Sequence, residues 1–235
     1  MAGEAVKEKG QETSRRILEV AKEVFSEVGY EGAHVDEIAR RARVNKATIY
    51  YHIGDKETLY AEVIHTVLGN TAERISRDIR STDSPQEKLR VFIRNLARTV
   101  EENPQMPPLM MREIAGGGRN LPDIVPRDMG RIIGMLTEIM DEGREKGVFV
   151  PARPFLVHFM VIGALLLYKS SAPIRARRKE FDGIFRPVGE DVTKVLCGEI
   201  EDLILRGLSA KPPSPRQAGR GKETASGRTK KKGAL

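Results

Sequence analysis

Residues 35–56 read VDEIARRARVNKATIYYHIGDK, and this stretch decides the fold of the N-terminal part of the chain. The first half of the stretch is predicted to be a short helix, because apolar residues recur there at helical spacing. These residues are Val35, Ile38, Ala39 and Ala42. A turn follows, and Asn45 is a good N-cap for a second helix because its side-chain oxygen accepts a hydrogen bond from an unpaired backbone N–H.

The second helix is predicted to show most of its side chains to solvent. Ile49 is its one strongly apolar residue and should face inward. The side chains left on the outside are Lys46, Ala47, Thr48, Tyr50 and His52. A helix-turn-helix presents a short polar and aromatic face of this kind to the DNA major groove. An ordinary helical hairpin is the alternative interpretation.

Helical patterns on both sides complete the unit. Thr13 is predicted to cap a preceding helix, and Gly29 lies where the left-handed residue after a helix belongs. Gly54 breaks the chain after the second helix, and Asp55 is predicted to cap a further helix. Residues 12–68 therefore predict three helices and a connecting fourth.

This segment resembles the tetracycline-repressor (TetR) family of bacterial transcription regulators. The residues that carry the resemblance, in one fixed spacing, are Ile17, Leu18, Ala21, Phe25, Gly29, Tyr30, Val35, Ile38, Ala39, Val44, Thr48, Ile49, Tyr50, Tyr51, His52, Lys56, Glu57 and Leu59. The resemblance implies an all-α fold of about nine helices, in which a three-helix DNA-binding head precedes a helical ligand-binding and dimerisation domain. Beyond residue 68 the chain resembles the family only in being a helical domain of suitable length.

Two positions depart from the family pattern. The family usually has glycine where this chain has Arg43, and a non-glycine residue at positive φ costs on the order of 1 kcal/mol. Either the turn differs or Arg43 carries this strain, and the side chain is either a phosphate contact or a solvated charge near Arg40, Arg41 and Lys46. The family places Thr or Ser where this chain has His34, which is either a phosphate contact or simply exposed.

The residues expected to contact DNA lie on the second helix, at its N-cap and among the nearby basic side chains. They are His34, Arg40, Arg43, Asn45, Lys46, Ala47, Thr48, Tyr50, Tyr51, His52 and Lys56.

Composition predicts a soluble cytoplasmic protein. The first residues are polar and resemble no signal peptide. The longest apolar stretch, Phe155 to Tyr168, has 14 residues, fewer than the about 20 that span a bilayer, so a buried core helix and no membrane contact are expected. Cys197 is the single cysteine, and no Cys/His spacing suggests a metal or other cofactor. No nucleophile and base occur at a recognisable spacing, which argues against an enzyme.

The net charge of +7 is confined to one end of the chain. Residues 206–235 contain nine Lys/Arg and one Glu, whereas residues 1–205 contain 31 Lys/Arg and 32 Asp/Glu. Attraction of the folded part to DNA must therefore come from a local patch. Residues 210–235 are rich in Gly, Pro, Ser and Lys and are predicted to be disordered. This tail is either a non-specific DNA tether or a solvated extension.

The middle of the chain has long apolar helical stripes. Ser84 to Glu87 form a capping box that opens one helix, and two very apolar helices are expected near residues 154–171 and 188–208. In the family such helices pair across a two-fold axis, so the resemblance implies a homodimer. The expected interface residues are Leu165, Val192, Leu196, Ile200, Leu203 and Ile204.

Seven of the eight methionines lie between Met106 and Met160. Methionine is flexible and lines adaptable apolar cavities, so the cluster suggests a pocket for a small apolar or aromatic effector. The alternative is plain core packing, and a satisfied core histidine is the simpler interpretation of His158. The candidate pocket residues are Phe92, Leu96, Met106, Met110, Met111, Met135, His158 and Phe159.

Together these patterns predict a transcriptional regulator, a ligand-responsive dimeric repressor that binds a palindromic operator in double-stranded DNA. Its domains are expected at residues 1–54 (DNA binding), 55–209 (ligand binding and dimerisation) and 210–235 (basic tail). One alternative is a regulator of the same fold that is controlled by a protein partner without a small effector. The other is a helical scaffold that no longer binds DNA.

Overall fold

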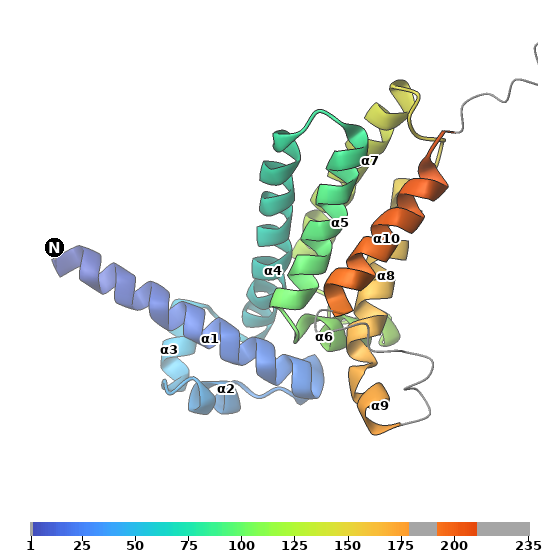
Figure 1. Cartoon of the computed structure of the whole chain (residues 1–235). Coiled ribbons are helices and arrows are strands. Elements are labelled where there is room, and N and C mark those ends of the chain that lie inside the picture. The colour runs from blue at the N-terminus through green and yellow to red at the C-terminus, as the bar shows by residue number, and fades with distance from the viewer. Residues whose placement is uncertain (1, 179–191, 211–235) are drawn as a thin grey trace, which may run out of the picture.

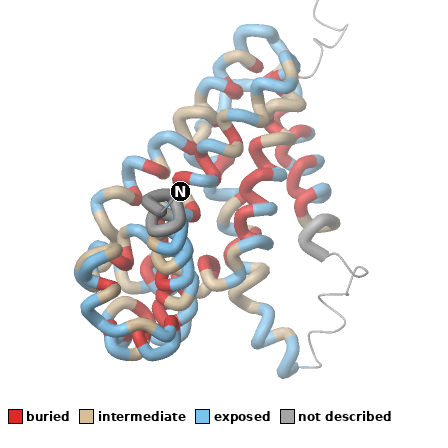
Figure 2. The backbone as a smooth tube through the Cα atoms, turned by 90° about the vertical axis from the view of Figure 1, so that its left-hand side faces the viewer, coloured by how far each residue is buried: buried red, intermediate tan, exposed pale blue. Residues whose placement is uncertain are grey.

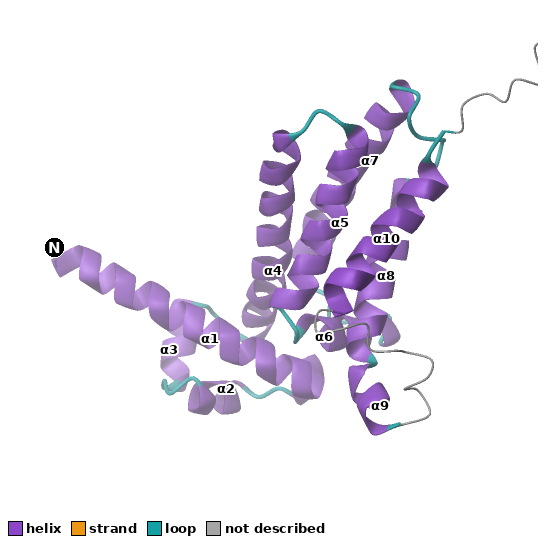
Figure 3. Cartoon of the chain, in the orientation of Figure 1, coloured by secondary structure: helices purple, strands orange, loops and turns teal. Residues whose placement is uncertain are grey.

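The computed structural model describes residues 2–178 and 192–210, whose regular elements are all helices joined by turns and loops, with no β-strand within those ranges (Figures 1 and 3). The all-α prediction is confirmed. The helices are α1 (Ala2–Gly32), α2 (Val35–Arg41), α3 (Lys46–His52), α4 (Lys56–Asp78), the 3-10 turn η1 (Ile79–Ser81), α5 (Pro85–Glu102), α6 (Met106–Ala115), α7 (Ile124–Glu145), α8 (Pro154–Ser170), α9 (Ala172–Arg177) and α10 (Val192–Leu208). The basic tail beyond Ala210 lies outside the described residues.

The start of α1 differs from the sequence-based expectation. Thr13 does not cap this helix, because α1 already begins at Ala2 and the Thr13 hydroxyl donates a hydrogen bond to the Lys9 carbonyl one turn earlier. The other end agrees with the prediction, since Gly29 has a φ of 74° and interrupts the helix there. The longer α1 extends past α3 (Figure 1).

Three predicted caps are confirmed. The Asn45 side chain accepts a hydrogen bond from the Thr48 backbone N–H at 2.7 Å and so begins α3. Asp55 accepts one from the Thr58 N–H at 2.8 Å and begins α4. Ser84 accepts a longer one, 3.4 Å, from the Glu87 N–H and begins α5. Each cap satisfies a donor that the helix itself cannot pair.

The buried apolar side chains form two clusters. The head cluster joins α1 to α4 with parts of α6 and α7, and its fully buried members include Ile17, Ala21, Phe25, Ile38, Ile49, Leu59, Tyr60, Ile64 and Leu109. The body cluster lies between α4, α5, α7, α8 and α10, and includes Ile75, Leu89, Phe92, Ile93, Leu136 and Val161. In Figure 2 buried and exposed positions alternate along these helices, as burial of one side predicts. Helix α4 contributes to both clusters and so connects head and body.

Helix α8 is buried along one side only, whereas its sequence predicts a buried core helix. One side, with Val157, Val161 and Leu165, enters the body cluster, whereas Phe155 and Leu167 on another side are 59% and 60% exposed. The segment Pro154–Arg177, at 24 residues, is long and apolar enough to cross a membrane by length and composition alone, longer than the expected 14. Core helices pass the same test, and the buried side of α8 packs in the body cluster.

His158 on α8 is buried without a hydrogen-bond partner. It is 1% exposed, and neither ring nitrogen is paired with any of the described residues, so the interpretation of His158 as a satisfied core histidine is wrong. Its ring meets the Phe92 ring edge to face at a centroid distance of 6.3 Å. Burial lowers the pKa of the His158 imidazole from 6.5 to about 4, because the apolar surroundings disfavour its charged form.

His158 should make the protein sensitive to acid. The unfolded chain binds this proton more readily than the folded one, so the free energy of unfolding should fall as the pH decreases from about 6.5 to about 4, by roughly 3 kcal/mol in total. Substitution of His158 by Phe should remove this contribution. The measurement is the difference in urea unfolding free energy between wild type and His158→Phe across that pH range. Parallel pH profiles of the two proteins would contradict the assignment.

Candidate nucleic-acid interface

Helix α3 shows two adjacent tyrosines to solvent. Tyr51 is 86% exposed and Tyr50 is 49% exposed, although large aromatic side chains are ordinarily buried. Ile49, on the inward side of α3, is fully buried against α1 and α2, as the sequence predicts. Lys46 and Ala47 are exposed too, and His52 is half-buried with its ring edge to face against Tyr51. The outward face of α3 is thus compatible with contact to another macromolecule.

Two of the expected contact residues are already engaged in the cap. Asn45 Oδ1 accepts hydrogen bonds from both the backbone N–H and the hydroxyl of Thr48, each at 2.7 Å. Their first role is therefore to orient α3. The Thr48 methyl and the Asn45 amide N–H₂ remain for other contacts.

Ion pairs hold α2 against its neighbours. Arg40 binds both carboxylate oxygens of Glu37, at 2.7 and 2.8 Å, and Arg41 bridges Glu37 and Glu27 at 2.7 and 2.8 Å. Hydrogen bonds from these two guanidinium groups lower the pKa of the Glu37 carboxyl to about 2. Such exposed pairs add little stability, but they set where the arginines lie. A DNA phosphate would have to compete with these carboxylates.

Two lysines near α3 are also paired. Lys46 Nζ lies 3.0 Å from Asp36, which joins the start of α3 to the start of α2, and this contact raises the pKa of Lys46. Lys56 lies over the Tyr30 ring at 4.5 Å and donates to the Glu31 carbonyl at 3.4 Å. Lys56 thus lies against the end of α1 in this conformation.

Arg43 has the left-handed backbone that glycine would adopt more easily. Its φ is 54°, the one positive φ outside glycine within the described residues, so the turn keeps the family geometry and Arg43 carries the strain. Its exposed side chain has no ion-pair partner in that part of the chain. His34 at the start of α2 is exposed and makes no cap hydrogen bond. Both side chains are available to an anion.

A buried contact joins α4 to α6, and the sequence did not reveal it. The Tyr60 hydroxyl of α4 donates a 2.7 Å hydrogen bond to Glu113 of α6, and both residues are at most 3% exposed. Arg112 of α6 donates to the Glu27 carbonyl at 3.2 Å and packs against Gly29. Helix α6 therefore contacts the end of α1 directly. Tyr60 and Glu113 are 53 residues apart in the sequence, so no local sequence pattern predicts that they form a hydrogen bond.

The candidate effector residues are only partly gathered. Phe92 and Leu96 are buried in the body cluster, His158 is buried with its ring against Phe92, and Met110, Met111 and Met135 pack against the cluster while partly exposed. Met106 belongs to the head cluster. The prediction that Phe159 lines the effector pocket is wrong for the single chain, because its side chain is 49% exposed and its ring contacts Phe155 outside the core. Two clefts of about 290 and 510 Å³ occur in the described part of the chain, and none of the eight candidates lines either.

The expected dimer interface also needs correction. Leu165, Ile200 and Ile204 are at most 8% exposed within the single chain, because they face its own body cluster. Leu196 packs partly against the same cluster, and nothing is described of the Val192 side chain. Leu203, at 69% exposed, is the expected residue that remains accessible. The apolar side chains exposed on α8 are Phe155, Leu156, Phe159, Met160 and Leu167.

Within residues 2–178 and 192–210 no group of three or more His, Cys, Asp or Glu side chains is placed to hold a metal ion.

Comparison with known proteins gives one consistent family. A model described as "Bacterial regulatory proteins, tetR family" matches residues 17–63, which contain the exposed α3. A second model, "Tetracyclin repressor-like, C-terminal domain", matches residues 85–176 of the body.

Individual relatives agree with these models. The HTH-type transcriptional regulator RutR of Escherichia coli strain K12 is 25% identical over 159 residues, which cover 68% of this chain and 74% of RutR. The fatty acid metabolism regulator protein of Bacillus subtilis strain 168 is 25% identical over 132 residues, 56% of this chain and 68% of that protein. The crystal structure of the TetR family transcriptional regulator PfmR from Thermus thermophilus is 30% identical, with a TM-score of 0.60 over 82% of this chain and 98% of PfmR.

These relatives are transcriptional regulators and not enzymes. With an exposed helix-turn-helix, two matching family models and a solved relative that matches most of its length, this chain belongs to the TetR family of DNA-binding bacterial transcription regulators.

Proposed function

We propose that this regulator is a cytoplasmic homodimer that represses transcription from a palindromic operator and releases it when a small effector binds. The observation that carries the proposal is α3, whose exposed Tyr50 and Tyr51 lie on a helix fixed by a cap and by ion pairs. Residues 1–54 then form the DNA-binding domain and residues 55–209 the effector-binding and dimerisation domain.

The DNA contacts are of two kinds. Base edges in the major groove would meet the α3 side chains from Lys46 to His52, since a recognition helix reads bases with a few outward residues. Phosphates would meet Arg43 and His34, which have no carboxylate partner among the described residues. A phosphate would also meet Arg40 if it displaced the Glu37 carboxylate that now pairs with this arginine. Phosphate contacts position the head, and base contacts specify the sequence.

The dimer is proposed to form through the exposed apolar side of α8 together with Leu203 of α10. In Figure 1 both helices lie on the side of the body away from α4, so a partner there leaves the DNA-binding head uncovered. Exposed apolar side chains gathered on neighbouring helices are unfavourable in water and mark a candidate association surface. The two α3 helices of the dimer would have to lie about 34–36 Å apart, or another whole turn of DNA, to enter successive major grooves.

The effector is proposed to bind among the remaining candidate residues, which lie in the body except for Met106 of the head cluster. They are Phe92, Leu96, Met106, Met110, Met111, Met135 and His158. The unpaired ring nitrogens of His158 support this, because buried polar groups in proteins are nearly always hydrogen-bonded. The route to the head runs through α6, which carries three of these methionines and contacts both Tyr60 and the end of α1. An effector that favours a different position of α6 would change the separation of the two heads and weaken operator binding.

The first test concerns Tyr50. Tyr50→Ala should weaken binding to the operator at least about tenfold, because the side chain lies where base edges and phosphates are expected. The unfolding free energy should change little, since half of the side chain is exposed. Fluorescence anisotropy with the DNA that flanks the gene measures the affinity, and Val150→Ala, an exposed apolar truncation in the body, is the control. Equal affinities of Tyr50→Ala and the control would refute the assignment of α3.

The second test separates strain from charge at Arg43. Arg43→Gly relieves the positive φ, worth about 1–2 kcal/mol, but adds roughly 0.5–1 kcal/mol of backbone entropy loss, so the protein should be stabilised by no more than about 1.5 kcal/mol. If Arg43 contacts a phosphate, the slope of log affinity against log salt should become shallower by about one unit. Arg43→Lys should keep the wild-type slope. Identical slopes for all three proteins would leave Arg43 as a solvated charge.

The third test concerns the dimer. Phe159→Glu should give a folded monomer, because it places a charge in the proposed interface while the side chain is exposed in the single chain. Leu165→Glu should instead unfold the protein, since Leu165 is 1% exposed in the chain's own core. Sedimentation equilibrium and circular dichroism distinguish these outcomes. A stable Phe159→Glu dimer would show that the subunits associate through another surface.

A further inference from the structure

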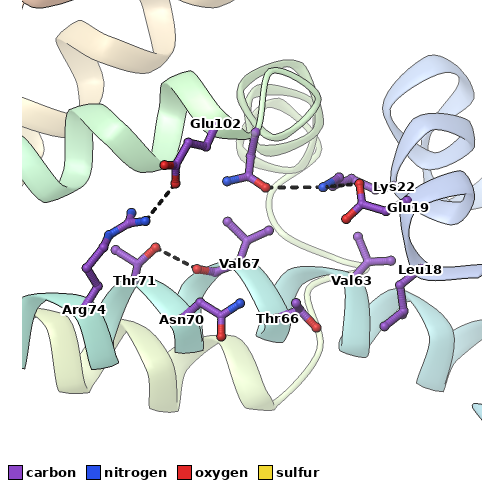
Figure 4. A pocket seen from close by; sticks show the side chains of 11 residues that line it. Leu18, Glu19, Lys22, Val63, Thr66, Val67, Asn70, Thr71, Arg74 and Glu102 are labelled. Carbon is purple, nitrogen blue, oxygen red and sulfur yellow. Dashed lines mark hydrogen bonds and ion pairs between the residues drawn. The ribbon is translucent and has the colours of Figure 1, made fainter. Parts of the chain in front are cut away.

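A cleft of about 290 Å³ lies where α1 of the head meets α4 and the end of α5 (Figure 4). None of the candidate effector residues lines it. Leu18, Val63 and Val67 provide apolar lining. Lys22 enters from α1 and Arg74 from α4, on opposite sides of the cleft (Figure 4).

The charges of this cleft are arranged by depth. The cationic side chains are largely buried, Lys22 at 9% and Arg74 at 15% exposed. Their carboxylate partners are at the rim, Glu19 at 61% and Glu102 at 44% exposed. An exposed ion pair contributes little free energy, because water screens it and the carboxylate side chain is immobilised. The anions can therefore leave more easily than the cations.

Both cations are held in place by uncharged groups as well. Lys22 Nζ donates to Asn103 Oδ1 at 3.3 Å, and Arg74 donates to Asn95 Oδ1 at 2.8 Å and to the Thr99 hydroxyl. An ammonium group has three donors, and Lys22 uses one for Asn103 and one for Glu19. Among the described residues the third donor of Lys22 has no partner, so it is available to a ligand in addition to the one that Glu19 would release.

We propose that this cleft is a second regulatory site, which binds a small organic carboxylate. The carboxylate of the ligand replaces Glu19 on Lys22, the charge of Arg74 adds to the favourable potential, and a short apolar portion covers Leu18, Val63 and Val67. The volume lies at the lower end of the range for ligand sites, which favours a molecule smaller than a typical drug.

The position of the cleft gives such a ligand a regulatory effect. Its walls come from the head helix α1, from α4, which contributes to both clusters, and from the end of α5 in the body, so the ligand contacts both parts at once. Its affinity then depends on the angle between them, and by linkage it shifts the orientation of the head. Binding can be measured without DNA, so its failure is distinguishable from a failure of the proposed operator function.

The test uses straight-chain carboxylates from acetate to octanoate, with the corresponding primary amides as uncharged controls, on the full-length protein. Isothermal titration should show saturable binding of at least one carboxylate, with its amide at least tenfold weaker. Absence of binding throughout the series, or equal binding of acid and amide, would overturn the proposal. Inorganic phosphate that binds more tightly than every carboxylate would overturn the ligand class.

Three variants locate the binding. Lys22→Met removes the ammonium and should weaken the best carboxylate at least tenfold. Asn70→Trp fills the cleft from an exposed position and should do the same with both cations intact, so the test stands if Lys22→Met folds poorly. Lys88→Met is the control, since Lys88 is a largely buried lysine, 21% exposed, that pairs with Glu142 in the body. Unchanged binding in Asn70→Trp, or an equal loss in Lys88→Met, would place the ligand elsewhere.

Discussion

The hydroxyl of Tyr60 donates its hydrogen bond to Glu113 inside the junction of head and body, where neither side chain meets solvent. Burial and the nearby carboxylate raise the pKa of Tyr60, so the phenol stays protonated and remains a donor. Removal of either partner would leave a buried polar group without a hydrogen bond. This lowers the free energy of unfolding by about 1–3 kcal/mol for an uncharged group, and by more for a charged one. Together with the packing of Tyr60 against Phe25 and Tyr30, this bond fixes α6 against α4 and α1.

The position of α3 depends on this junction, because α4 begins only a few residues after the end of α3. The head cluster extends along α4 as far as Val67, and the body cluster begins at Ala72 on the same helix. A rigid helix that is buried in two cores transmits a rotation of the body to the head. Movement of α6 in response to an effector would therefore reach α3 through buried contacts.

Charge in this protein acts locally. The arginines of α2 lie in pairs with Glu37 and Glu27, and Lys46 pairs with Asp36, so much of the basic surface near α3 is balanced in the absence of DNA. A DNA phosphate would have to replace one of these carboxylates, so each phosphate contact would add less binding free energy than a contact to an unpaired cation. Sequence specificity would then come from the base contacts. The cleft at Lys22 would use the same exchange, with a free carboxylate in place of Glu19.

By itself the sequence determined the helical class, the caps at Asn45, Asp55 and Ser84, and the exposed face of α3, because each follows from residues within a few positions of one another. It determined less about the body. Periodicity shows that α8 and α10 are apolar, but not which apolar side faces the chain's own core, so Leu165, Ile200 and Ile204 were assigned to the wrong surface. The Tyr60–Glu113 bond, the unpaired His158 and the Lys22 cleft bring together residues from different helices. Only the tertiary structure decided these, since contacts between distant segments depend on how whole helices pack and leave no periodic signal in the chain.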